Sequence, residues 1–200
     1  PWCYIGKARL DLALKEIEPE ISLRVEWNPF ELNPSLPKKG MDRADYLRIK
    51  FGSTSSAKKI YRQILINAEA DELELNLEAI KKVPNTRDAH KLILSANSPK
   101  LQNLIVSKLF EAYFILGVDI GEANNLLDIA AKSGFQRSEA ENILVDPELN
   151  SRIEALEEQA SNLGIMGVPA FLYNGHYLFS GAQSAETIRL SIIKAHKRHL

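Results

Sequence analysis

The sequence predicts an α/β fold in which two β-forming regions flank a large block of helices. Apolar and polar residues alternate over positions 21–27, which is the two-residue period of a strand. Near the C-terminal end, two β-type runs are joined by Asn174-Gly175, and between these regions apolar residues recur at helical spacing. With 200 residues, 45% of them hydrophobic, the chain can form one domain, or one domain with a large insertion.

Composition and charge exclude several classes of protein. The chain has 25 basic and 26 acidic residues, so the basic face of a nucleic-acid-binding protein is not expected. No apolar stretch approaches the roughly 18 residues of a membrane span, so no membrane partner is expected either. The single cysteine, Cys3, excludes an internal disulfide framework and a cysteine-rich zinc site. It also favours a reducing compartment, and we expect a cytoplasmic protein.

The first part of the chain is predicted to form a helix, a strand and a loop. Apolar residues at three- and four-residue intervals predict a helix over residues 4–17, and Pro19 ends it. The alternating strand over residues 21–27 follows. Three prolines between positions 29 and 37 then break regular structure, and the loop continues to Gly40.

The middle of the chain is predicted to be helical. Asn85 can cap a helix, and Ser98-Pro99 is a clear start signal because the first turn does not use the N–H that proline lacks. The segment from Asp119 to Glu122 resembles a capping box. Together with the apolar spacing, these signals predict helices over residues 42–51, 57–70, 85–96, 99–116, 119–132 and 147–163, and a short helix that begins at Ser138.

The last part of the chain returns to β structure and ends in a helix. Residues 168–173 and 176–179 are β-type runs, and Asn174-Gly175 between them is the strongest short signal for a hairpin. Ser184 is placed to cap a final amphipathic helix with Ile188, Ile192 and Ala195 inward.

This order of elements matches a thioredoxin-like layout if one strand precedes Pro1. Because the chain opens on Pro1-Trp2-Cys3-Tyr4, in the middle of a motif, we expect further residues upstream. A parallel βαβ unit, an antiparallel hairpin and a last helix would then form the thioredoxin-like domain. We predict that residues 1–34 and 148–200 form this domain and that residues 35–147 form a helical insertion.

Cys3 and Pro169 are the residues with the clearest chemical potential. Cys3 lies in the first turn of the first helix, where unpaired N–H groups and the helix dipole stabilise a thiolate. The alternative is an inert cysteine that acts as a small hydrophobe. Pro169, inside a β-type run, must lie at an edge, a bulge or a cis turn. In the thioredoxin layout a cis-proline loop packs at this point against the active-site helix; an ordinary edge-strand proline is the alternative.

Several motifs in order along the chain resemble the FrnE-like branch of the DsbA family of thiol–disulfide oxidoreductases. The opening heptapeptide resembles the continuation of a Cys-Pro-Trp-Cys active site. The matching segments cover essentially the whole chain: Pro1 to Lys7 with Arg9-Leu10, Pro29 to Pro34, Asn85-Thr86 with Ala89-His90, Leu109 to Phe114, Gly164 to Pro169, and Ser180 to Gln183.

The resemblance implies a two-cysteine redox site. The nucleophilic first cysteine would stand immediately before Pro1, and Cys3 would be the resolving cysteine, while Pro1 and Trp2 would tune thiolate stability. A cis Val168–Pro169 bond would place the Val168 backbone beside the sulfurs, where it can pair with an extended substrate. Asn85 would line the substrate cleft, unless it serves only as a helix cap.

Two alternatives remain open at this point. The 2-hydroxychromene-2-carboxylate isomerases and kappa-class glutathione transferases resemble this architecture but carry serine at the nucleophile position, and glutathione would then be the co-substrate. A non-catalytic thioredoxin-like binding module is the other. We expect no bound cofactor and no metal, and a thiol- or disulfide-containing protein or small molecule as the substrate. The helical insertion is also compatible with a homodimer.

Overall fold

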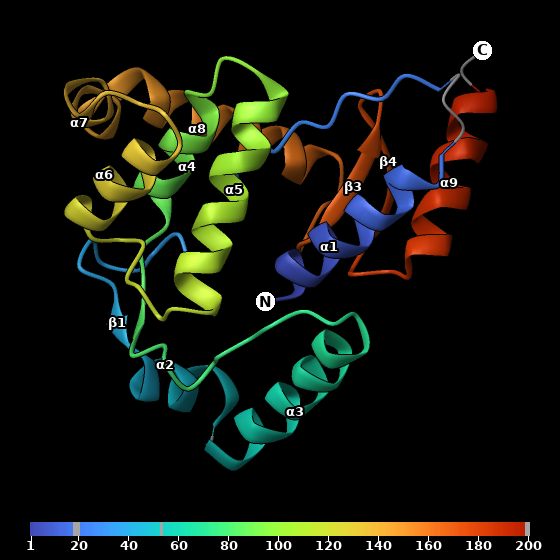
Figure 1. Ribbon diagram of the computed structural model, residues 1–200. Coiled ribbons are helices and arrows are strands. Elements are labelled where there is room, and N and C mark those ends of the chain that lie inside the picture. Colours follow the sequence, from blue (N-terminus) through green and yellow to red (C-terminus); the bar gives the residue numbers. More distant parts are fainter. Residues whose placement is uncertain (18–20, 53, 199–200) are drawn as a thin grey trace. The chain divides into compact units, whose positions relative to one another are not determined.

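The computed structural model describes residues 1–17, 21–52 and 54–198. No helix in these ranges is both long enough and apolar enough to cross a membrane. In chain order, the elements are α1 (Trp2–Lys15), β1 (Met41–Asp42), α2 (Arg43–Phe51), α3 (Thr54–Ala70), β2 (Lys82–Val83), α4 (Arg87–Leu94), α5 (Pro99–Phe114), α6 (Ala123–Lys132), α7 (Arg137–Val145), α8 (Pro147–Asn162), β3 (Ala170–Tyr173), β4 (His176–Ser180) and α9 (Ala185–Arg198) (Figure 1).

The chain folds into two compact units. Unit 1 consists of Pro1–Leu23, Arg62–Glu74 and Ala160–Leu200, and unit 2 consists of Arg24–Tyr61 and Leu75–Gln159. Unit 1 therefore includes residues 62–74, which the sequence had assigned to the insertion. The predicted division of the chain into domains at residues 34 and 147 stays a prediction.

Unit 1 is built on the packing of α1 against α9, beside the hairpin formed by β3 and β4 (Figure 1). As predicted, the apolar side of α9 is buried through Ile188, Ile192 and Ala195. Helix α9 begins after Ser184, whose hydroxyl accepts a hydrogen bond from the backbone N–H of Thr187 at 3.1 Å.

The predicted hairpin is present, with the turn that its sequence requires. Asn174 and Gly175 have φ values of 46° and 78°, the positive values that a type I′ turn needs at both positions. Strands β3 and β4 pair antiparallel, and Phe171 lies opposite Phe179 with ring centroids 4.7 Å apart. This stacked pair holds the hairpin together on one face.

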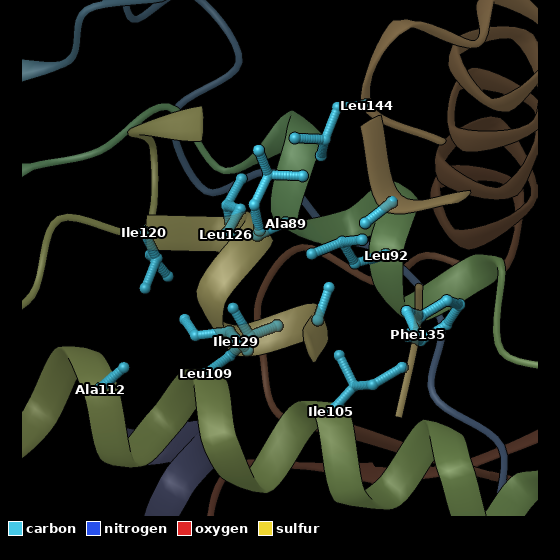
Figure 2. Packing of buried hydrophobic residues seen from close by; sticks show 13 residues of the cluster. Ala89, Leu92, Ile105, Leu109, Ala112, Ile120, Leu126, Ile129, Phe135 and Leu144 are labelled. Carbon is cyan, nitrogen blue, oxygen red and sulfur yellow. The ribbon is translucent and has the colours of Figure 1, made fainter. Parts of the chain in front are cut away.

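Unit 2 has a helical core. Thirteen buried side chains, from Ala89 on α4 to Leu144 on α7, form one cluster. Helix α5 contributes Ile105, Leu109 and Ala112, which point from one side of the helix toward α4 and α6 (Figure 2). The start of α5 is as predicted, because the Ser98 side chain accepts a hydrogen bond from the Leu101 N–H and a proline occupies the first turn.

The predicted strand over residues 21–27 is not a strand in the structure. Its side chains do alternate between half-buried and exposed, as a strand would require. However, no backbone ladder joins this segment to any described residue, and a strand exists only when its backbone groups pair with a neighbour. The partner strand that we expected would precede Pro1.

Other differences concern helix starts and short β bridges. The capping box predicted from Asp119 does not form: the Asp119 carboxylate instead accepts a hydrogen bond from the N–H of Gly121 at 2.9 Å, and α6 begins only at Ala123.

Strands β1 and β2, which the sequence did not predict, form a two-residue antiparallel ladder. A pair this short leaves almost no periodic signal in the sequence.

Candidate functional site

Cys3 lies in the first turn of α1, in unit 1. The turn is closed by Pro1, whose carbonyl accepts hydrogen bonds from the N–H groups of Tyr4 at 3.0 Å and Ile5 at 3.1 Å. Pro1, Trp2 and Cys3 are all half-buried, and Cys3 is a free thiol. Burial raises the pKa of the Cys3 thiol above its ordinary value, so the neutral thiol is favoured at neutral pH.

Pro169 lies against the same helix. The Val168–Pro169 peptide bond is cis, and Pro169 is buried. A Cβ atom built on Gly6 would stand 2.9 Å from Cγ and 3.4 Å from Cβ of Pro169. The proline ring therefore packs directly over the Gly6 backbone, where any side chain would push it away. Gly6 is three residues after Cys3, on the same side of the helix.

A ring of contacts fixes the proline to the hairpin and the hairpin to α1. The Pro169 carbonyl accepts from the Gly181 N–H at 2.8 Å, just beyond the last paired residues, Ala170 and Ser180. The carbonyl of Ala182, the residue after Gly181, accepts a hydrogen bond from Nη1 of Arg9 at 2.6 Å. Arg9 is one helical turn after Gly6, so both ends of this chain of contacts are on α1.

The guanidinium of Arg9 also bonds the second segment of unit 1, residues 62–74. Its Nε donates to the Asp71 carboxylate at 2.7 Å, and its Nη2 donates to Oδ1 of Asn67 at 3.1 Å. Only 13% of the Arg9 side chain is exposed. The sequence placed Arg9 in a matching motif but assigned it no role, because no local pattern shows that an arginine near the start of a helix is buried.

The loop that leads to Pro169 is open. Met166 is 93% exposed, and nothing lies within 4 Å of a Cβ built on Gly167. Val168 is half-buried, and its backbone N–H and C=O make no hydrogen bond to the described part of the chain. This leaves an edge of free backbone groups beside the proline, which an extended segment of another molecule could pair with.

Asn85 belongs to unit 2, and its side chain is committed to local structure. Its Oδ1 accepts from the Arg87 N–H at 3.0 Å, at the start of α4, and its Nδ2 donates to the Leu36 carbonyl at 2.9 Å. Asn85 therefore forms a turn just before α4, but the predicted cap at Asn85 does not form, because the N-cap residue is Thr86 and its side chain makes no capping bond. The role of Asn85 in binding a substrate stays a prediction.

A polar cluster in unit 2, which the sequence did not predict, lies beside the half-buried His90. Nε and Nη2 of Arg87 donate to Glu31, and Nη1 donates to Glu154 at 2.8 Å; the hydrogen bond to Glu31 is the main reason that the pKa of Arg87 is raised. The Glu31 side chain is 2% exposed, and its backbone N–H donates to the Glu157 carboxylate.

His90 stands beside this cluster. Burial lowers its pKa to about 4, although the charge of Glu31 and a hydrogen bond to the Phe30 backbone act in the opposite direction. Its Nδ1 is buried and has no partner among the described residues. His90 is thus half-buried as a residue, and its imidazole is neutral at neutral pH. From the sequence, His90 could line the substrate cleft or be a surface histidine with satisfied hydrogen bonds, and a role in the cleft stays a prediction.

The described residues hold no group of three or more His, Cys, Asp or Glu side chains that could bind a metal ion. A surface hollow of about 780 Å³ lies in unit 2 between Ser95 and residues from Gln136 to Pro147. It includes none of the predicted site residues. Cys3 and Pro169 lie in unit 1, where the proline packs on the Gly6 backbone and Cys3 is half-buried.

Comparisons with known proteins agree with this geometry. The family profile of the DSBA-like thioredoxin domain matches residues 1–192. The chain is similar to YwbO of Bacillus subtilis, an uncharacterized protein, with 25% identity over 99% of this chain and 93% of the relative. It is also similar to the crystal structure of a probable DsbA oxidoreductase from Streptomyces coelicolor, with 26% identity and a TM-score of 0.86 over 98% of this chain and 86% of that chain.

A further solved structure is similar in fold alone. This is a 2-hydroxychromene-2-carboxylate isomerase, with 13% identity and a TM-score of 0.73 over all of this chain and 92% of that chain. The predicted fold class, an α/β thioredoxin-like fold with a helical insertion, is confirmed by the family match and by the first of these structures.

Proposed function

The chain belongs to the family of DsbA-like thioredoxin domains, and from that premise we propose that it is a thiol–disulfide oxidoreductase of the FrnE-like branch. Its site would be a Cys-Pro-Trp-Cys sequence whose first cysteine stands immediately before Pro1. The observation that carries this proposal is the packing of Pro169, in a cis peptide bond, on Gly6, one helical turn after Cys3.

The reaction is two successive exchanges of disulfide bonds. The thiolate of the first cysteine attacks one sulfur of the substrate disulfide, forms a mixed disulfide, and releases the other substrate sulfur as a thiolate that takes up a proton. Cys3 then loses its proton and attacks the enzyme sulfur of the mixed disulfide, which releases the second substrate thiol. The substrate gains two electrons and two protons, and the two enzyme cysteines become a disulfide. The reverse sequence oxidises a dithiol.

The surroundings of Cys3 suit the second of these steps. A resolving cysteine acts only after the mixed disulfide has formed, so it does not need to be a thiolate in the resting enzyme. Burial raises the Cys3 pKa and keeps it protonated, which favours this role over that of the attacking nucleophile. The unpaired backbone of Val168 would hold an extended substrate beside the sulfurs, as a strand pairs with a sheet edge.

The residue before Pro1 separates this function from glutathione chemistry. A cysteine there supports the oxidoreductase. A serine would favour a glutathione-dependent isomerase or transferase, in which the hydroxyl stabilises the glutathione thiolate, and the isomerase of similar fold is the observation that keeps this candidate open. A residue of neither type would favour a binding module without turnover.

The decisive experiment is the variant Cys3→Ser in the natural full-length protein. We expect it to accumulate mixed disulfides with a disulfide-containing peptide, because the first exchange still occurs and the second cannot. Turnover should fall at least about a hundredfold, since the resolving step is lost. Mass spectrometry of the acid-quenched reaction measures the trapped adduct.

The control for this experiment is Cys3→Ala, which removes both the thiol and any hydroxyl. It should trap the same adduct, and both variants should keep the wild-type unfolding midpoint within a few degrees. Unchanged turnover in either variant would contradict the role of Cys3 as the resolving thiol.

A further inference from the structure

The proposed reaction does not use Arg9. The hydrogen bonds of Arg9 nevertheless lead to the loop that contacts Pro169. Arg9 bonds the Ala182 carbonyl at 2.6 Å, and the preceding residue, Gly181, donates its N–H to the Pro169 carbonyl at 2.8 Å. The loop 181–183 therefore connects Arg9 to the proline through two consecutive residues. The proline in turn touches Gly6, one turn before Arg9 on the same helix.

We propose that Arg9 is a positioning residue for the substrate-binding loop at Val168 and Pro169. It holds loop 181–183, and through the Gly181 N–H it holds the Pro169 carbonyl at a fixed distance from α1. This inference rests on the proposed function, because it assigns the substrate edge to Val168. The guanidinium of Arg9 donates to Asp71, Asn67 and Ala182 and not to Cys3 or Val168, so its effect is on where the substrate lies and not on the sulfur chemistry.

The geometry requires an arginine at this position. Three acceptors surround the guanidinium: the Asp71 carboxylate at 2.7 Å, the Asn67 amide oxygen at 3.1 Å and the Ala182 carbonyl. A planar guanidinium carries five N–H donors in fixed directions and can bond all three at once, whereas a lysine ammonium cannot reach them together. Asp71 balances the charge, so the group can remain 87% buried without leaving an unpaired cation.

The arrangement also explains why three separate segments meet in unit 1. Arg9 belongs to the first segment, Asn67 and Asp71 to the second, and Ala182 to the third. The Arg9 side chain thus connects the end of the hairpin to α1 and to residues 62–74. Because the proline loop continues directly from that end, any movement of the hairpin moves the Val168 edge relative to Cys3.

The test compares two substrates in the full-length protein. A peptide disulfide needs the Val168 edge for binding, whereas a small aromatic disulfide, such as dithiobis(nitrobenzoate), needs only the sulfurs. In Arg9→Met we expect the KM for the peptide to rise about tenfold, which corresponds to the loss of one charged hydrogen bond. The rate with the small disulfide should stay within about twofold of wild type, and Arg9→Lys should recover part of the peptide KM because it retains one donor.

The matched control is Asn67→Ala. It removes one acceptor from the same guanidinium but leaves the bonds to Ala182 and Asp71 in place. We expect its KM for the peptide to stay at the wild-type value. If Arg9→Met and Asn67→Ala change the peptide KM equally, or if both substrates lose rate equally in Arg9→Met, Arg9 only stabilises the fold and the proposal is overturned.

A second measurement keeps this inference separate from the proposed function. The Gly181 amide is protected by the Pro169 carbonyl, so its hydrogen exchange reports directly on the contact that Arg9 is proposed to hold. Exchange at Gly181 should accelerate about tenfold in Arg9→Met and remain unchanged in Asn67→Ala. If wild-type protein turns over neither substrate, the proposed function fails, and this exchange rate alone decides the role of Arg9: unchanged protection would overturn it.

Discussion

The contacts inside one compact unit of this chain differ in kind from the contacts inside the other. Unit 2 encloses a cluster of thirteen apolar side chains that come from one stretch of sequence, from Ala89 to Leu144. In unit 1, the contacts around Cys3 and Pro169 join segments at opposite ends of the chain, and the bond from Arg9 to Ala182 spans 173 positions. The difference teaches that packing stabilises the helical unit, whereas a few polar and backbone contacts locate the candidate site.

The largest expected effect is on the core of unit 2. Leu92 is fully buried in the cluster, so Leu92→Ala should remove about 4 kcal/mol of unfolding free energy, through lost apolar contacts and the cavity that remains. Denaturant unfolding measures this. The control is Leu116→Ala, whose side chain is 62% exposed and should change stability by less than about 0.5 kcal/mol. Equal losses in the two variants would show that the cluster does not carry the stability of this unit.

His90 should make unit 2 sensitive to acid. The pKa of His90 is lowered from 6.5 to about 4 in the folded protein, so the unfolded chain binds a proton first as the pH falls. Stability should therefore decrease as the pH drops from about 6.5 to about 4, by up to about 3 kcal/mol from this one group. Comparing wild type with His90→Gln at several pH values isolates the effect, because other groups titrate in both proteins. If the unfolding free energies of the two proteins change with pH in parallel, the folded protein does not hold His90 in its neutral form.

Asn85 sharpens the comparison, because it was predicted for the substrate cleft and lies in unit 2. Asn85→Ala removes the turn hydrogen bond to the Arg87 N–H and the hydrogen bond to Leu36, and should cost about 2 kcal/mol. If Asn85 is only structural, the KM for a peptide disulfide should not change. Asn85→Asp is the matched variant, because it keeps an acceptor for the Arg87 N–H and loses the donor to Leu36. A raised KM in both variants, without a matching loss of stability, would return Asn85 to the substrate site.

The smallest expected effect on stability is at Gly6. A change there should also raise the KM for peptide substrates. A Cβ at this position would meet the Pro169 ring at 2.9 Å, and overpacking of this kind costs about 1–3 kcal/mol, while alanine gains about 1 kcal/mol as a better helix former. We expect a net loss of about 1 kcal/mol in Gly6→Ala and a higher KM for peptide substrates. Gly167→Ala, which meets nothing within 4 Å, should leave the stability unchanged. An unchanged KM in Gly6→Ala would show that the proline contact does not position the substrate.

Local signals in the sequence predicted the elements whose conformation is set by neighbouring residues. Asn174-Gly175 predicted the hairpin because few other residues adopt positive φ at both positions of the turn. Ser98-Pro99 and Ser184 predicted helix starts because a cap depends on residues two or three positions away. The segment 21–27 shows the limit of such signals: its side chains alternate as predicted, but a strand also needs a partner, and pairing is not a local property.

The candidate site also has a part that local sequence signals predicted and a part that only the folded chain shows. The order of motifs was enough to place this chain in its family, and the residue types identified Cys3 and Pro169 as the residues to examine, because a thiol at a helix start and a proline in a strand run are unusual locally. The roles of Gly6, Arg9 and His90 emerged only from the folded chain. A close approach, a buried guanidinium and a shifted pKa all arise from residues far apart in sequence, and no periodicity records which of them will meet.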